Sequence, residues 1–158
     1  MNYLIRAIKE NEVHILQDFL YEAIFIPEGV LPPTRDILNE PELQVYITEF
    51  GGQKGDIGLV ADVKGKIVGA VWVRIMNDYG HIDNDTPSLA ISLYKEYRHL
   101  GIGSAMMRDM LYIVKEKGYK HISLSVQKAN YAVKMYKKFG FKVVDENDEE
   151  YIMVCHLQ

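Results

Sequence analysis

Residues 93–104 read LYKEYRHLGIGS, and they join an apolar run to a long amphipathic pattern. The apolar run, residues 89–93, predicts a buried strand. The pattern after the segment predicts a helix whose apolar face carries Met106, Met110, Ile113 and Val114. Two glycines therefore stand between a strand and the first turn of a helix, where unpaired backbone N–H groups and the helix dipole favour an anion. The segment predicts a binding turn for phosphate or pyrophosphate.

Two common phosphate motifs do not fit this turn. A Walker loop requires Lys-Ser or Lys-Thr after its last glycine, and a dinucleotide fingerprint requires glycine where Met106 stands. The pattern that remains is Arg-x-x-Gly-x-Gly, formed by Arg98, Gly101 and Gly103. A plain tight turn between a strand and a helix would also explain this pattern, so both interpretations stay open here.

The rest of the chain divides into short strands and helices. Before the segment, residues 3–9 predict a strand, residues 11–23 a helix, and residues 42–50 a helix opened by Pro41. Four of the five prolines lie between residues 27 and 41, which predicts a loop with short helical pieces. The remaining elements are a hairpin of residues 57–63 and 67–75, a strand at 122–126, a helix at 129–139 and a closing hairpin of 141–144 and 151–154.

The order of these elements predicts the fold class. Strands early in the chain, followed by a strand-helix-strand-helix unit, predict an α/β (α+β) fold with a mixed sheet and helices on both faces. The 158 residues suffice for one compact domain, because two cores of fewer than about 80 residues each would be marginal. We therefore expect residues 1–158 to form a single domain.

Composition narrows the class of protein. Eighteen basic against twenty-two acidic side chains give a formal charge of −4, which argues against nucleic acid as the main partner. No stretch approaches the roughly 18 apolar residues of a membrane-spanning helix, so no membrane partner is expected. Cys155 is the single cysteine, and the first residues lack the apolar run of a signal peptide. Both observations favour a cytoplasmic protein.

A second motif follows at residues 126–141, which read VQKANYAVKMYKKFGF. Together with Arg98, Gly101 and Gly103, it resembles the GCN5-related N-acetyltransferase (GNAT) family. In that family Gln/Arg-x-x-Gly-x-Gly/Ala binds acyl-CoA pyrophosphate, and Asn-x-Ala-x-x-x-Tyr-x-x-x-Gly-Phe forms a later helix and turn. The two motifs have the family's order and spacing. The resemblance is strong over residues 57–144 and weaker over residues 1–50.

The resemblance implies an αβα sandwich with a mixed, mostly antiparallel central sheet, formed by one acyl-CoA N-acyltransferase domain over residues 1–158. It implies direct transfer of the acetyl group of the co-substrate acetyl-CoA to a primary amine of a small molecule or peptide, with no metal. Ile91 and Leu93 would lie beside the pantetheine arm, which Asn130 would hydrogen-bond. The residues implied in holding pyrophosphate are Arg98, His99, Leu100, Gly101, Ile102, Gly103 and Ser104.

Two catalytic roles also follow from the resemblance. The backbone N–H of Leu93 would stabilise the negative charge that develops on the thioester carbonyl. Tyr136, which also lines the CoA site, would act as the general acid that protonates the leaving thiolate. An aromatic residue at helical spacing is equally compatible with a place in the core.

The group that takes the proton from the amine is not identified by the sequence. Relatives often place a glutamate on or just before the motif strand, where this chain has Ser88. The candidates are Asp83, Asp85, His81 and Glu28, and Glu28 and Asp83 are the two that we assign to acceptor binding. An amine that enters neutral would need no base.

Two other functions remain compatible with the sequence. A non-catalytic acyl-CoA-binding regulatory module would explain the missing strand glutamate. A phosphate-binding fold unrelated to CoA would explain the glycine turn alone. The resemblance allows a homodimer without predicting one, and the acceptor amine is not specified.

Overall fold

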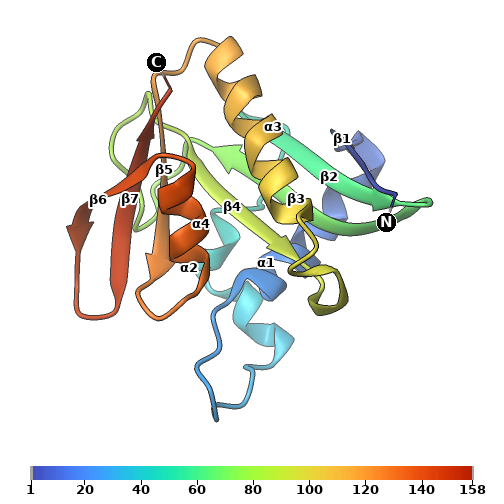
Figure 1. Cartoon of the computed structure of the whole chain (residues 1–158), viewed down its shortest axis with the longest axis horizontal. Coiled ribbons are helices and arrows are strands. Elements are labelled where there is room, and N and C mark those ends of the chain that lie inside the picture. Colours follow the sequence, from blue (N-terminus) through green and yellow to red (C-terminus); the bar gives the residue numbers. More distant parts are fainter. Residues whose placement is uncertain (1, 158) are drawn as a thin grey trace.

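Seven strands form one sheet in the order β1-β2-β3-β4-β5-β7-β6, with helices on both faces (Figure 1). The computed structural model describes residues 2–157. All neighbouring strands are antiparallel except β4 and β5, which are parallel. This arrangement confirms the predicted α/β class with a mixed, mostly antiparallel sheet. The strands are β1 (Leu4–Ala7), β2 (Ile57–Val63), β3 (Lys66–Arg74), β4 (Ser88–Leu93), β5 (His121–Gln127), β6 (Phe141–Glu146) and β7 (Glu150–His156).

Helices α3 (Ile102–Glu116) and α4 (Ala132–Lys138) cover one face of the sheet. The apolar side of α3 is fully buried there, as its periodicity predicts. The other face is covered by α1 (Leu16–Ala23), whose Leu16, Phe19 and Leu20 form a second core. The shorter elements are the 3₁₀ helices η1 (Glu10–Ile15), η2 (Arg35–Asn39) and η3 (Lys95–Tyr97), and α2 (Pro41–Gln44). Within the described residues, no helix is both long and apolar enough to cross a bilayer.

The helix expected over residues 42–50 is wrong in its extent, because α2 ends at Gln44. Turns continue to residue 50, with Tyr46 N–H bonded to the carbonyl of Leu43. The carbonyl oxygen of Val45 accepts a hydrogen bond from Arg74, and that of Tyr46 accepts one from the Trp72 indole. These tertiary donors take carbonyls that a continuing helix would use. Tertiary contacts therefore override the local helical pattern.

Other boundaries differ by a few residues. Residues 10–15 form a 3₁₀ helix before α1, and α4 begins at Ala132, not at residue 129. The closing hairpin is longer than predicted and uses part of the acidic run as strand. Its turn is held by Asn147, whose side-chain oxygen accepts the N–H groups of Glu149 and Glu150.

β4 and β5 are bridged only at their beginnings. Among the described residues, the pair Ser88–Ser123 is the single register pair between them, with Ser123 N–H bonded to the Pro87 carbonyl at 2.9 Å. Beyond that point the two strands diverge (Figure 1). We call the gap between β4 and β5 beyond this pair the splay. Strand backbone that lacks a neighbour must bond to something else, which makes the splay a place for a ligand.

A buried ion pair anchors the segment that follows α2. The Arg74 Nε and Nη2 donate to the two carboxylate oxygens of Asp56 at 3.0 and 2.9 Å, and both side chains are almost fully buried. Asp56 also accepts the backbone N–H groups of Gly51 and Gln53. The pair therefore fixes residues 45–56 against the end of β3.

Replacing Arg74→Met leaves the Asp56 carboxylate buried without its partner. We expect the free energy of unfolding to fall by about 3–5 kcal/mol, because an unpaired buried charge is costly. Urea denaturation at pH 7 measures the change. The control is Arg35→Met, since the Arg35–Asp18 pair at 2.6 Å is exposed and should cost less than about 1 kcal/mol. Equal losses in the two variants would contradict this view of the Arg74 pair.

Candidate active site

The backbone of β4 points unpaired groups into the splay. In the antiparallel pair of β3 and β4, Tyr94 N–H bonds to the Val68 carbonyl, and Gly69 stands opposite Leu93. Hydrogen-bonded and non-hydrogen-bonded pairs alternate along such a ladder. Ile91 and Leu93 therefore direct their N–H and C=O groups away from β3 and toward β5. Because β5 has diverged at this level, the N–H and C=O groups of Ile91 and the N–H group of Leu93 are available to a ligand.

The glycine turn follows directly at the open end of the splay. Gly101 has φ of +87° and precedes the first residue of α3, and His99 also has a positive φ, of 63°. A residue with a Cβ is disfavoured at the Gly101 conformation. The Gly101 carbonyl accepts the first helical bond from Ala105 N–H, so the N–H groups of residues 101–104 have no helical partner. The turn thus presents donors at the positive end of a helix dipole.

Arg98 holds the turn against both β4 and α1. Its Nε donates to the Leu93 carbonyl at 3.0 Å, and its Nη2 donates to the Glu22 carbonyl at 3.4 Å. The same Nη2 lies 3.9 Å from a carboxylate oxygen of Glu22. The guanidinium therefore satisfies a carbonyl that the splay leaves without a strand partner. It also places a positive charge next to the turn.

Two more predicted residues belong to the α4 region: Asn130 lies just before this helix and Tyr136 lies on it. The side-chain oxygen of Asn130 accepts the Ala132 N–H at 2.9 Å, which leaves its amide nitrogen as a free donor. A Cβ added to Gly103 would lie 3.6 Å from Leu93 Cδ1 and 4.0 Å from Met135 Sδ. The start of α3, the end of β4 and the helix α4 therefore converge at one place.

Tyr136 lies on α4 with 8% of its surface exposed, and its ring packs edge-on against Phe141. Its hydroxyl has no hydrogen-bond partner within residues 2–157, yet it is not sealed from solvent. Burial raises the pKa of Tyr136 above its ordinary value, and Tyr131 acts in the same direction. The phenol is therefore neutral at pH 7 and has a proton to donate.

The two residues predicted for acceptor binding lie apart. Glu28 is exposed in the loop between α1 and η2. Asp83 is exposed in the loop before β4, at the closed end of the splay, and its carboxylate accepts the Thr86 hydroxyl and the Asp85 N–H. These bonds lower the pKa of Asp83, the Thr86 bond most. The structure does not bring the two carboxylates together.

Sequence reasoning missed a polar group on the α1 and α2 side of the splay. The Tyr46 hydroxyl donates to one Asp78 carboxylate oxygen and the Ser88 hydroxyl donates to the other, each at 3.0 Å. Ser88 also lies 3.4 Å from the Ser123 hydroxyl. Because Tyr46 and Asp78 are 32 residues apart, no local pattern could have indicated this contact.

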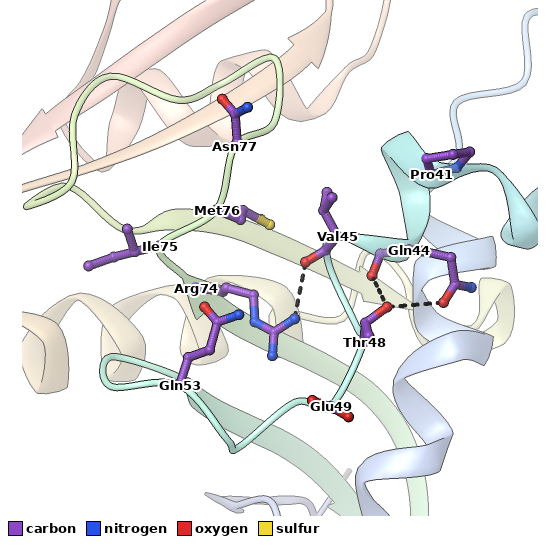
Figure 2. A pocket seen from close by; sticks show the side chains of 10 residues that line it. All are labelled: Pro41, Gln44, Val45, Thr48, Glu49, Gln53, Arg74, Ile75, Met76 and Asn77. Carbon is purple, nitrogen blue, oxygen red and sulfur yellow. Dashed lines mark hydrogen bonds between the residues drawn. The ribbon is translucent and has the colours of Figure 1, made fainter.

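An open pocket of about 520 Å³ lies beside α2 and the end of β3 (Figure 2). Several of its polar side chains already have protein partners. Arg74 bonds to Val45 and Asp56, and the Thr48 hydroxyl bonds to Gln44. The pocket is separate from the glycine turn. Within residues 2–157, no group of three or more His, Cys, Asp or Glu side chains could hold a metal ion.

The chain is similar to known acetyltransferases in both sequence and structure. The model of the acetyltransferase (GNAT) family matches residues 23–141. An N-alpha-acetyltransferase of Sulfolobus acidocaldarius is 27% identical over 146 residues, which are 82% of this chain and 86% of that protein. The probable N-acetyltransferase san of Drosophila melanogaster is 32% identical over 101 residues, covering 63% of this chain and 54% of that protein.

Solved structures share the fold. The crystal structure of the PaiA N-acetyltransferase from Thermoplasma acidophilum in complex with coenzyme A is 22% identical, with a TM-score of 0.73 over 99% of both chains. The matched residues 23–141 make up more than half of this chain and include the glycine turn, Asn130 and Tyr136. The chain belongs to the acetyltransferase (GNAT) family and is an acetyl-CoA-dependent N-acetyltransferase.

Proposed function

We propose that residues 1–158 act as one cytoplasmic domain that transfers the acetyl group of acetyl-CoA to a primary amine of a small molecule or peptide by direct attack. The observation that carries this proposal is the splay, whose unpaired strand groups run directly into the helix N-terminus at Gly101. A thioester arm ending in a pyrophosphate matches this combination. A nucleotide phosphate alone would use the turn and leave the strand groups unpaired.

Each part of the acetyl-CoA molecule has a partner in this proposal. The N–H groups of the turn bind the pyrophosphate, with Arg98 adding charge. The turn consists of His99, Leu100, Gly101, Ile102, Gly103 and Ser104. The pantetheine amides bond to the free N–H and C=O groups of Ile91 on β4, as an added strand would. The arm passes beside Leu93, whose carbonyl is held by Arg98 and whose N–H is left for the thioester end. The free amide nitrogen of Asn130 donates to the same arm.

During the transfer, negative charge develops on the thioester oxygen and on the leaving sulfur, and both must be stabilised. The amine nitrogen attacks the thioester carbonyl, and the Leu93 N–H stabilises the negative charge that develops on its oxygen. As the C–N bond forms, the C–S bond breaks, and Tyr136 gives its proton to the leaving sulfur. The acetylated nitrogen releases its surplus proton to solvent, and Tyr136 takes a proton back from solvent, so the enzyme returns to its starting state. Burial that raises the pKa of Tyr136 also raises that of a thiol beside it. The proton affinities of the phenol and the sulfur therefore shift together.

We assign the acceptor side to the loop after α1 and the loop before β4. Because Glu28 and Asp83 lie apart in these loops, we assign their carboxylates to different parts of a cationic acceptor. The name of the Sulfolobus acidocaldarius relative, an N-alpha-acetyltransferase, favours a peptide α-amine as one acceptor class. The net charge of −4 suits a basic acceptor of either size.

The test of the proposed function is CoA release from acetyl-CoA by the purified protein. Acceptors are amine-bearing peptides, amino acids, polyamines and aminoglycosides, and CoA binding is measured calorimetrically in parallel. We expect one class to raise turnover well above acetyl-CoA hydrolysis. CoA binding with no acceleration by any amine would instead support a binding module, and absence of CoA binding would contradict the assigned site.

Tyr136→Phe removes the proposed acid and keeps the buried ring. We expect kcat to fall by about a hundredfold, since a positioned proton donor contributes that much or more. The dissociation constant of CoA should stay within about twofold, because the ring contacts remain. The control is Tyr112→Phe, on the exposed side of α3, which should leave both constants unchanged. A Tyr136→Phe enzyme with full kcat would rule out the acid role.

Asn130→Asp separates the two tasks of this side chain. An aspartate keeps the oxygen that accepts Ala132 N–H and suits the helix N-terminus, so the melting temperature should not fall. The free N–H donor is lost, and CoA affinity should drop about tenfold, the value of one hydrogen bond. Calorimetric titration with CoA measures this, and unchanged affinity would remove Asn130 from the site.

A further inference from the structure

Asp78 stands at the closed end of the splay, on the face opposite α3 and α4. Leu89, Ile91 and Leu93 belong to the core under α3 and α4, so the alternation along β4 turns Ser88 to the other face. Asp78 is bonded to Ser88 on that face. A Cβ on Gly80, in the same loop, would lie 3.2 Å from the Ser125 N atom of β5. The loop that carries Asp78 therefore lies over the start of the splay.

Tyr46 reaches across the splay from the other side. Its carbonyl accepts the Trp72 indole N–H at 3.1 Å, and Trp72 pairs with Ala90 of β4, so its backbone lies above β3. The Tyr46 hydroxyl donates to Asp78, and a hydrogen bond with Ser125 of β5 lowers the pKa of Tyr46. The hydroxyl end of the side chain therefore lies near β5. The ring of Tyr46 thus spans the divergent strands.

The Asp78 carboxylate is stabilised by hydrogen bonds from two hydroxyl groups and not by an ion pair. Among residues 2–157, no lysine, arginine or histidine lies within salt-bridge distance of Asp78. The contrast is Asp56, whose charge Arg74 neutralises. The other titratable groups nearby are Tyr46, His81 of the same loop and Glu150 at the start of β7. A part-buried carboxylate without a cation attracts a cationic ligand.

Tyr46 is suited to pass a proton and unsuited to act as a base itself. Burial raises the pKa of Tyr46 well above its ordinary value, and the charge of Asp78 raises it further. The phenol is therefore neutral at pH 7. Its O–H donates to Asp78, and a hydrogen bond with Ser125 lowers its pKa, so Ser125 acts as a donor to this oxygen. A phenol oxygen has two lone pairs, and the second can accept a hydrogen from an ammonium group.

We propose that Asp78 is the proton acceptor for the acceptor amine and that the Tyr46 hydroxyl carries the proton to it. This inference rests on the proposed function. The ammonium proton moves to the Tyr46 oxygen while the Tyr46 proton moves to Asp78, and the freed nitrogen lone pair attacks the thioester carbonyl. The Asp78 carboxyl group returns its proton to solvent after the product leaves. β4 itself, SLAISL, carries no acidic side chain that could do this.

The test is Asp78→Asn, which keeps the shape and a hydrogen-bond acceptor but cannot take the proton. We measure kcat/KM for the amine from pH 6 to pH 10. At pH 7 we expect a loss of about a hundredfold. The loss should shrink as pH rises, because above the pKa of the amine the acceptor arrives neutral and needs no base. CoA affinity and melting temperature should match wild type, and Asp109→Asn, on the exposed side of α3, is the control.

Tyr46→Phe is a second, independent test, because it removes the hydroxyl that passes the proton and leaves the Asp78 carboxylate in place. It should show the same pH-dependent loss. A loss that is equal at all pH values in both variants, or no loss in either, would overturn the inference while the enzyme activity stands. If the wild-type protein binds CoA but acetylates no amine, the proposed function fails and this inference fails with it.

Discussion

The parallel pair of β4 and β5, bridged only at Ser88 and Ser123, is the constraint on which the site depends. Every other neighbouring pair in the sheet is antiparallel and paired along several residues, with one irregularity each in β2–β3 and β6–β7. Divergence of one pair leaves N–H and C=O groups unpaired inside an otherwise complete sheet. Unpaired backbone groups are costly when buried, and a ligand with amide groups relieves that cost. The binding site is thus a defect that the sheet can tolerate only because it is open to a ligand.

Separate segments hold the two ends of this defect. At the open end, Arg98 occupies the Leu93 carbonyl and reaches the end of α1. At the closed end, the loop with Asp78 and Gly80 packs over β5 and bonds to Ser88. Both arrangements satisfy polar groups beside the splay without filling it. The divergence of the strands is therefore fixed from both ends by side chains that remain near the reacting groups.

The sequence predicted the local geometry of the candidate site where that geometry depends on a short motif. Gly101 needs a positive φ between a strand and a helix, and Asn130 precedes a helix, so short motifs reveal both. It could not predict the Tyr46–Asp78 contact, because neither residue has a local pattern and the fold alone brings them together. The same reason explains the helix predicted over residues 42–50, which ends early where Trp72 and Arg74 take its carbonyls. Long-range contacts decide what a periodic pattern leaves undetermined.

Part-buried Tyr46 and buried Tyr136 lie on opposite faces of the splay, and the mechanism that we propose gives them opposite roles. Burial raises the pKa of Tyr46 and of Tyr136, so both remain neutral phenols. Tyr46 donates to a carboxylate, and a proton that reaches its oxygen can move on only toward Asp78. No hydrogen bond of the Tyr136 hydroxyl to another residue is found within residues 2–157, and in the mechanism that we propose the leaving sulfur of the substrate accepts its proton. The direction of each proton transfer is therefore set by what the hydroxyl touches and not by the kind of residue that carries it.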